Sequence, residues 1–170
     1  KYLKEDCYPF RLNRVIQIQE FEGFQNIGDI DNDMKDDFVF VLNPLSYCEE
    51  GQSYYFSNPT IERIYTESNC CHPNSIFSIG DIDEDGRNEI GQYYSSCASR
   101  FKKINIWTNN GNNWELVDEI AFTINDEFEV FKDFNKLYKK KSKGILEFLE
   151  ISDINANGEL IKDWKTIEMK

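Results

Sequence analysis

Two stretches of the chain, IGDIDNDMKDDF at residues 27–38 and IGDIDEDGRNEI at residues 79–90, carry nearly the same string 52 positions apart, counted from 27 to 79. Ile, Gly, Asp, Ile, Asp and Asp recur at matching offsets and are followed by an acid and an apolar residue. A period of this length is typical of stacked or radially arranged structural units. The repeat therefore predicts that two parts of the chain share one local structure.

Each copy presents its acids in a pattern that suits a cation. Asp at positions 1, 3 and 5 of a tight loop directs three carboxylates toward one point, and the carbonyl at position 7 and an acid at position 9 complete an oxygen cage. Because these ligands are hard oxygens in a short flexible loop, calcium is favoured over transition metals and magnesium. We expect two Ca2+ sites, formed by Asp29, Asp31, Asp33, the carbonyl of Lys35 and Asp37, and by Asp81, Asp83, Asp85, the carbonyl of Arg87 and Glu89.

The spacing departs from that of an EF-hand after the first ligands. An EF-hand needs a bidentate Glu at position 12 and a following helix. Position 12 is Phe40 in the first loop and Gln92 in the second, and the chain continues as a predicted strand. Each loop is therefore expected to join two strands, and a metal-free Asp-rich turn is the alternative interpretation.

Short β-branched and aromatic runs between turn signals predict an all-β chain with at most one short helix. The sequence NNGNN tolerates positive φ, so the runs on either side of it are expected to form a hairpin. Residues 126–143 have nearly helical apolar spacing and are either that short helix or an irregular excursion. The predicted strands are RVIQIQEF (14–21), DFVFVL (37–42), SYYF (53–56), SIFSIG (75–80), EIGQYY (89–94), KINIWT (103–108), WELVDEIAF (114–122) and GILEFLEI (144–151).

The two loops resemble the FG-GAP or VCBS-like repeats of integrin-type β-propellers and of many secreted bacterial proteins. The hallmark of those repeats is a Gly-Asp-x-Asp-x-Asp-Gly-x-x-Asp/Glu-apolar loop that joins two strands of a blade. The second loop matches this pattern throughout, with Gly86 as its glycine. The first has Met34 there, which predicts a strained or differently shaped turn. A third stretch, ISDINANGELI at 151–161, has Ile161 in place of the ninth-position acid and is expected to keep the turn without the metal.

The resemblance implies an incomplete β-propeller-like assembly of antiparallel hairpins joined by Asp-rich calcium loops. Two clear units and one degenerate unit are too few for a closed seven-bladed ring. A length of 170 residues fits one domain over residues 1–170. Its units are expected at about 14–70, 71–125 and, in degenerate form, 126–170.

The formal net charge of −12 argues against a nucleic-acid or anionic-membrane surface, because both attract basic faces. No stretch approaches 18 apolar residues, so no membrane span is expected. The only strong positive cluster is the basic run at 139–143. It is expected to be a solvated turn before the last strands, with partner binding as the alternative.

The cysteines indicate whether the chain belongs in an oxidising compartment. In an oxidising environment we expect one or two disulfides and at least one remaining thiol, with a zinc site around Cys70, Cys71 and His72 as an alternative. The chain is expected to be secreted, periplasmic or on the cell surface, with any leader removed and a lipid anchor ahead of residue 1 left open. The five cysteines are Cys7, Cys48, Cys70, Cys71 and Cys97, and their pairing is open.

No phosphate loop, nucleophile elbow or zinc-protease helix is present in the sequence, so no enzymatic activity is expected. The leading hypothesis is a calcium-binding module whose fixed loops shape a surface for a protein or glycan partner. Aromatic residues at 53–56 and 93–94 are candidate contacts, with cross-strand packing as the alternative. Other hypotheses are an exported inhibitor or immunity-type protein against a cell-wall hydrolase, and an unrecognised glycan hydrolase.

Overall fold

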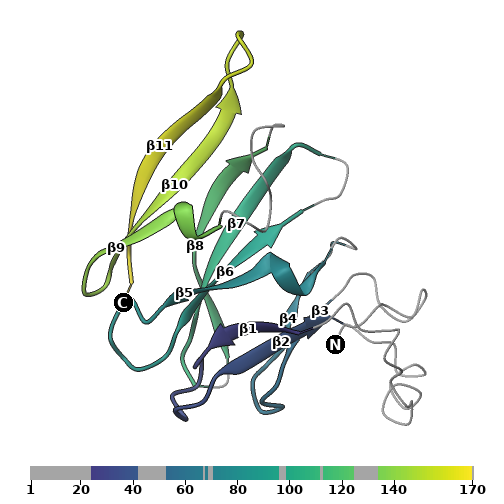
Figure 1. The fold of residues 1–170 in the computed structure, drawn as a ribbon, viewed down its shortest axis with the longest axis vertical. Coiled ribbons are helices and arrows are strands. Elements are labelled where there is room, and N and C mark those ends of the chain that lie inside the picture. Colours follow the sequence, from purple (N-terminus) through teal and green to yellow (C-terminus); the bar gives the residue numbers. More distant parts are fainter. Residues whose placement is uncertain are drawn as a thin grey trace.

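The computed structural model describes residues 24–41, 53–66, 68, 71–95, 99–111, 113–124 and 134–169, and over these residues the chain is all-β, as predicted (Figure 1). The only helical elements in those ranges are single 3-10 turns at Pro73–Ser75 and Phe134–Lys136. The predicted strand at 14–21 lies outside the described residues. The strands are β1 (Gln25–Gly28), β2 (Asp37–Val41), β3 (Ser53–Phe56), β4 (Ile64–Tyr65), β5 (Ile76–Gly80), β6 (Glu89–Tyr94), β7 (Phe101–Asn109), β8 (Trp114–Thr123), β9 (Tyr138–Ser142), β10 (Ile145–Ile154) and β11 (Leu160–Glu168).

The sequence repeat is also a structural repeat. Strands β1 to β4 form a four-stranded antiparallel meander, and β5 to β8 follow one another in the same antiparallel order in the second sheet. In each copy the strand before the acidic loop has a bulge, between Asn26 and Gly28 in the first and between Ser78 and Gly80 in the second. Both glycines have positive φ, 74° and 90°, which is why glycine recurs there.

The last three strands extend the second sheet. Strand β10 pairs with β9 and β11 in antiparallel fashion and meets β8 in parallel at the single pair Ile151 and Phe122. Figure 1 shows the β10–β11 hairpin projecting beyond the rest of the molecule. These strands form a partial third unit beside two complete ones, consistent with an incomplete propeller-like β fold.

Two apolar clusters hold the units face to face. The first joins Ile27, Val39 and Tyr54 of the first sheet to Ile76 and Ile90 of β5 and β6. In the second, strands β7 and β8 pack against β10 and the chain before it; its fully buried members include Ile104, Ile106, Ile120, Phe122, Leu137, Leu146 and Phe148. Shared burial of large side chains is how neighbouring β units stabilise one another.

Two predictions about the chain after residue 125 need correction over the part that the structure describes. Of the segment 126–143, the described part begins at Phe134, and from there it is a 3-10 turn followed by β9 rather than an α-helix. The reason is backbone pairing with β10, in which Tyr138 lies opposite Phe148 and Lys140 opposite Leu146. The basic run is therefore mostly strand, although its lysines are exposed as expected.

The predicted hairpin around NNGNN is confirmed by a β7–β8 ladder from Phe101 opposite Thr123 to Asn109 opposite Trp114, with one bulge between Ile106 and Trp107. Strands β4, β9 and β11 were not predicted as strands, and β1 was expected only as the strand that leads into the first acidic loop. Strand β11 reads LIKDWKTIE and exposes most of its side chains, so it lacks the alternation that marks a half-buried strand. No helix within the described ranges is long and apolar enough to cross a membrane.

Candidate metal centre

Asp29 organises the first acidic loop, which we define as residues 29–37. Its Oδ1 accepts hydrogen bonds from the amides of Asn32 at 2.6 Å and Asp33 at 3.2 Å, and its Oδ2 accepts one from the amide of Met34 at 2.8 Å. The Asp33 amide also donates to Asp31 Oδ1 at 3.0 Å. The backbone amides thus turn inward onto the first carboxylates, as in a nest of Asx turns.

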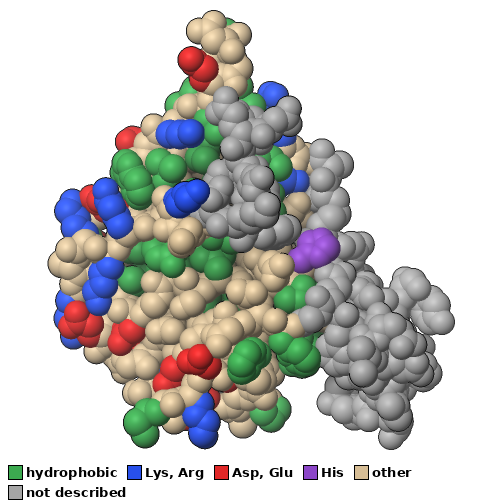
Figure 2. All heavy atoms as spheres, viewed as in Figure 1, with side chains coloured by type: hydrophobic (Ala, Val, Ile, Leu, Met, Phe, Trp, Pro, Cys, Tyr) green, Lys and Arg blue, Asp and Glu red, His purple; other side chains and the backbone are tan. Residues whose placement is uncertain are grey.

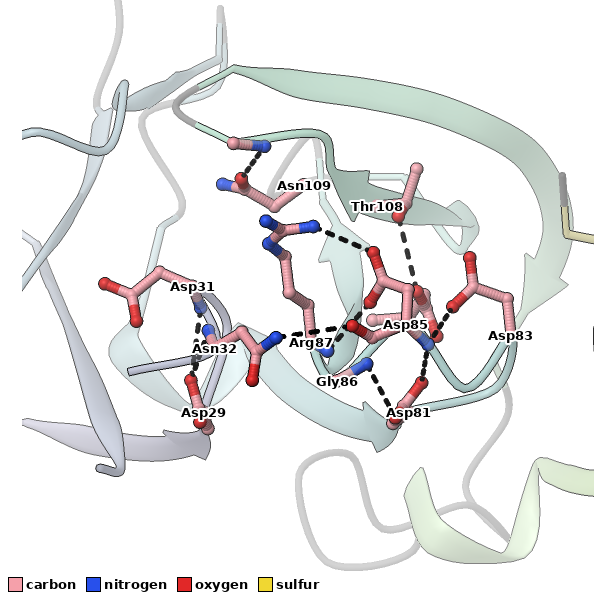
Figure 3. A network of polar contacts seen from close by, with 12 residues as sticks. Asp29, Asp31, Asn32, Asp81, Asp83, Asp85, Gly86, Arg87, Thr108 and Asn109 are labelled. Atoms are coloured by element: carbon pink, nitrogen blue, oxygen red, sulfur yellow. Dashed lines mark hydrogen bonds and ion pairs between the residues drawn. The ribbon is translucent and has the colours of Figure 1, made fainter. Parts of the chain in front are cut away.

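The second acidic loop, residues 81–89, repeats three of these four bonds. Asp81 accepts from the amides of Asp85 at 3.1 Å and Gly86 at 3.0 Å, and the Asp85 amide also donates to Asp83 Oδ1 at 3.1 Å (Figure 3). Equivalent atoms therefore make equivalent bonds 52 residues apart, as from Asp29 to Asp81. The two loops are two copies of one device.

The glycine position shows how far the copies agree. Gly86 has φ 94°, and Met34 at the matching place has φ 67°, so both occupy the left-handed region. Asn32 and Glu84 form a second matching pair, at φ 65° and 61°. The turn predicted to be strained or differently shaped is therefore the same shape, with a left-handed methionine at a cost of roughly 1–2 kcal/mol.

Three carboxylates converge in each loop. One oxygen from each of Asp29, Asp31 and Asp37 lies within 4.8 Å of the others, and the same holds for Asp81, Asp83 and Glu89. Oxygens bound to one calcium ion at about 2.3–2.6 Å lie no more than roughly 5 Å apart, so this spacing fits such an ion. Two Asp-rich groups in this chain could hold a metal ion.

The closing acid of each loop is buried. Glu89 is 1% exposed; its Oε2 accepts from the Ile82 amide at 2.7 Å and its Oε1 accepts from Thr108 Oγ1 at 3.3 Å. Burial first, and the charges of Asp83 and Asp81 to a lesser extent, raise the pKa of Glu89 to about 7, against the lowering effect of its two hydrogen bonds. Neither hydrogen-bond partner carries a charge, so the carboxylate is a poorly compensated anion that a cation would stabilise.

Asp37 plays the same part in the first loop. It is 6% exposed, and it accepts from the Ile30 amide at 3.4 Å and from Ser57 Oγ at 2.8 Å. Burial raises its pKa as well, against the lowering effect of the Ser57 hydrogen bond. The shorter side chain makes the longer bond to the loop amide, which is the main geometric difference between the two closing acids.

The remaining predicted ligands are placed differently. Asp33 and Asp85 stand outside the two converging groups, and each forms an ion pair with the basic residue two positions on. Asp33 Oδ2 lies 3.0 Å from Lys35 Nζ, and Asp85 Oδ2 lies 2.9 Å from an Arg87 guanidinium nitrogen. The carbonyls of Lys35 and Arg87 stay predictions.

Three supporting residues were not predicted from the sequence. Asn58 Nδ2 donates to Asp31 Oδ2 at 2.6 Å, and Ser57 and Thr108 hold the closing acids as described. All three lie at or just after the end of the third strand of their unit, β3 or β7. A polar residue ending that strand is the only signal in the sequence, and it is a weak one.

The β9–β10 turn rests on the second loop. Lys140 Nζ donates to the Asp81 carbonyl at 2.9 Å and lies 3.2 Å from Glu84 Oε1. The Gly144 amide donates to the Ile82 carbonyl at 2.8 Å. Figure 2 shows basic side chains interspersed with acidic ones along one edge of this face. Part of the basic run thus compensates an acidic loop of the same chain.

The third stretch keeps the turn, with Gly158 at φ 86°. Its side chains are arranged differently, because Asp153 Oδ1 accepts from the adjacent Ile154 amide and Asp153 pairs with Ile161 across the β10–β11 ladder. Asn155 Oδ1 instead accepts from the amides of Asn157 and Glu159. The hairpin closes with no inward-facing carboxylate set like those of the first two loops.

Several predicted features contribute little to this centre. Tyr54, Phe56 and Tyr93 are buried in the core, so cross-strand packing is confirmed for them, and Tyr55 stacks on Phe40 with ring centroids 5.7 Å apart. Cys71 is buried and His72 exposed. The other four cysteines lie outside the described residues, so the disulfide and zinc predictions stay open.

Comparison of the chain with protein-family models, with curated proteins and with solved structures gave no match.

Proposed function

We propose that this protein is a secreted or surface-exposed calcium-binding β module of the FG-GAP or VCBS-like kind, with a structural metal in each acidic loop. The observation that carries the proposal is the double occurrence of one arrangement, in which two partly exposed Asp carboxylates meet a buried third carboxylate. A single acidic turn is common without a metal. Two copies with the same hydrogen bonds, and a closing acid with a raised pKa in each, are harder to explain without a cation.

The chemistry of the ligands favours calcium. All the converging groups are carboxylate oxygens, which are hard ligands. The short, irregular loop suits the variable coordination of calcium better than the octahedral coordination that magnesium requires. Calcium would compensate the charge that the fold collects at Glu89 and Asp37, so binding would count toward folding free energy. Its role would be to hold the loop between the strands on either side, β1 and β2 or β5 and β6.

The expected partner is a protein or a glycan, met by the surface that these fixed loops help to shape, and the module carries no catalytic function of its own. A glycan array probed with the full chain in calcium and in chelator tests the second half of the proposal. Binding of the chain to arrayed glycans in calcium but not in chelator supports a glycan partner. Equal binding in both conditions would show that glycan binding does not depend on the calcium loops.

Calorimetric titration of chelator-stripped protein with calcium tests the metal sites. We expect two equivalents and, at calcium about 100-fold above Kd, a stabilisation of roughly 2.7 kcal/mol per site. The variants Asp31→Asn and Asp83→Asn should each lose one equivalent, and Asp153→Asn in the third turn should lose none. Absence of both heat and thermal shift in the unaltered protein would overturn the proposal.

A further inference from the structure

The two acidic loops are joined to each other by one backbone hydrogen bond and one side-chain hydrogen bond. The amide of Asn88 donates to the carbonyl of Asp29 at 2.7 Å, which links the residue before Glu89 to the first residue of the first loop. In the other direction, Asn32 Nδ2 lies 3.4 Å from the Asp85 carbonyl. Figure 3 shows Asn32 reaching from the first loop toward Asp85 in the second. Each loop therefore holds part of the other.

Close packing at two glycines reinforces these contacts. A Cβ at Gly28 would lie 1.9 Å from Asn88 Nδ2, and a Cβ at Gly86 would lie 2.6 Å from Asn32 Nδ2. Gly80, the counterpart of Gly28 in the second unit, has nothing within 4 Å of the same position. A methyl group at either glycine would therefore displace an asparagine side chain at the contact between the loops.

The charges permit joint occupation. Each loop carries five acidic side chains and one basic one, so its formal charge is −5 + 1 = −4, and the pair carries −8. One divalent ion leaves −6 and two leave −4. The second ion therefore still enters a region of net negative charge, although it is attracted less strongly than the first. A positive coupling between the sites must then come from the contact between the loops.

We propose that the two loops bind calcium cooperatively, each ion raising the affinity of the other loop through the contact between Asp29, Asn32, Asp85 and Asn88. This inference rests on the proposed metal function of the same loops. The physical reason is that an ion orders its own loop, and the shared contacts order the neighbouring loop at the same time. The second ion then meets a loop that has already lost most of its conformational freedom.

Half-site variants measure the coupling. Calcium affinity at the first loop is compared by calorimetry in the full chain and in Asp83→Asn, which lacks the second site. We expect the first-loop affinity to fall by about fivefold or more, the lower end of usual coupling, and Asp31→Asn should weaken the second loop by the same factor, since coupling is reciprocal. Asp153→Asn serves as the control and should change neither affinity.

A matched pair of glycine variants tests whether the loop contact carries the coupling. Gly28→Ala and Gly80→Ala impose similar left-handed strain, but only Gly28→Ala pushes a methyl group into Asn88. In Gly28→Ala the effect of Asp83→Asn on first-loop affinity should shrink below about twofold, whereas in Gly80→Ala it should stay at about fivefold or more. Adding Asn88→Ala to Gly28→Ala removes the obstructing amide and should restore the effect. Far-ultraviolet circular dichroism verifies that each variant is folded.

The outcomes separate this inference from the metal function. Two calcium equivalents with independent affinities, unchanged within twofold by loss of the other site, would overturn cooperativity and leave the metal function standing. A coupling of equal size in Gly28→Ala and Gly80→Ala would overturn the role of the contact. If the unaltered protein binds no calcium, the proposed function fails and the inference fails with it.

Discussion

The first acidic loop turns its left-handed corner with Met34, whereas the second turns the same corner with Gly86. The loops nevertheless make matching hydrogen bonds, from the amides at positions 5 and 6 to the first Asp. The carboxylate of that Asp thus sets the shape of the loop, and the residue at the corner sets only how much strain the shape costs. The glycine of the repeat pattern is an energetic preference rather than a geometric requirement.

The two loops differ more in their closing acids, Asp37 and Glu89, and in the segments that surround them. Glu89 accepts from its loop amide at 2.7 Å and Asp37 at 3.4 Å, and the pKa of Glu89 is raised to about 7. The second loop also lies between the first loop and the β9–β10 turn, with Lys140 bonded to it. The second loop therefore combines the less strained backbone with the greater burial of charge and the larger number of neighbours.

The largest expected difference between the loops is in their response to pH. Because Glu89 must lose its proton to bind calcium, affinity at the second loop should fall by up to about tenfold per pH unit below pH 7. Because the pKa of Asp37 is raised less, the first loop should keep its calcium affinity down to a lower pH. Calorimetry of Asp31→Asn and Asp83→Asn between pH 5 and 8 measures each loop alone. Parallel pH profiles would contradict the distinction.

The metal-free protein should show the opposite trend. A carboxyl group whose pKa is raised by folding keeps its proton between its ordinary value of 4.5 and about 7, where the unfolded chain has lost it. The stability that this group contributes is fully present below pH 4.5. It is lost as the pH rises toward 7, by up to about 1.4 kcal/mol per pH unit. Thermal melting in chelator should show this slope, and Glu89→Gln should flatten it while Asp153→Asn leaves it unchanged.

A methyl group at the glycine corner should destabilise the second loop. Gly86→Ala forces an alanine into φ 94° and against the amide of Asn32, at a cost of roughly 2 kcal/mol or more. For a chain of this size the melting temperature should fall by about 4–8 °C. Gly158→Ala is the control, since its φ is 86° and nothing lies within 4 Å of the added atom. Equal losses in both variants would leave strain alone as the cause.

The reverse change should improve the first loop. Met34→Gly relieves left-handed strain of about 1–2 kcal/mol and loses roughly 0.5–1 kcal/mol to the greater freedom of the unfolded chain. Met34 is 90% exposed, so no packing is lost, and a net gain of up to about 1.5 kcal/mol is expected. Chemical denaturation in chelator measures the gain. A net loss would show that the methionine side chain has a contribution of its own.

The sequence was most informative where one local pattern carries both structure and chemistry. The repeat at 27–38 and 79–90 predicted two equivalent strand–loop–strand units, and NNGNN predicted the β7–β8 hairpin. Both depend on short-range rules, Asx turns and positive φ, which neighbouring residues satisfy by themselves. The same locality explains why three of the four predicted carboxylates in each loop do converge.

What the sequence did not reveal depends on contacts between distant segments. Strand β9 carries consecutive lysines and becomes a strand because β10 supplies its backbone partners. Asn58 reaches Asp31 from 27 residues away, and the contact of Asn88 with Asp29 spans the repeat itself. No periodicity within a short window encodes such pairings, since tertiary contacts override local propensity.

The smallest predicted effect concerns the lysine at the second loop. Lys140→Met removes a positive charge bonded to Asp81 and Glu84, so calcium affinity at the second loop should rise by about two- to fivefold at low salt and by less at high salt. Lys141→Met is the matched control, because Lys141 pairs with Glu147 instead. Calorimetry of both variants in the Asp31→Asn background isolates the second loop. A fall in affinity in Lys140→Met would mean that this lysine supports the loop's shape more than it opposes the ion's charge.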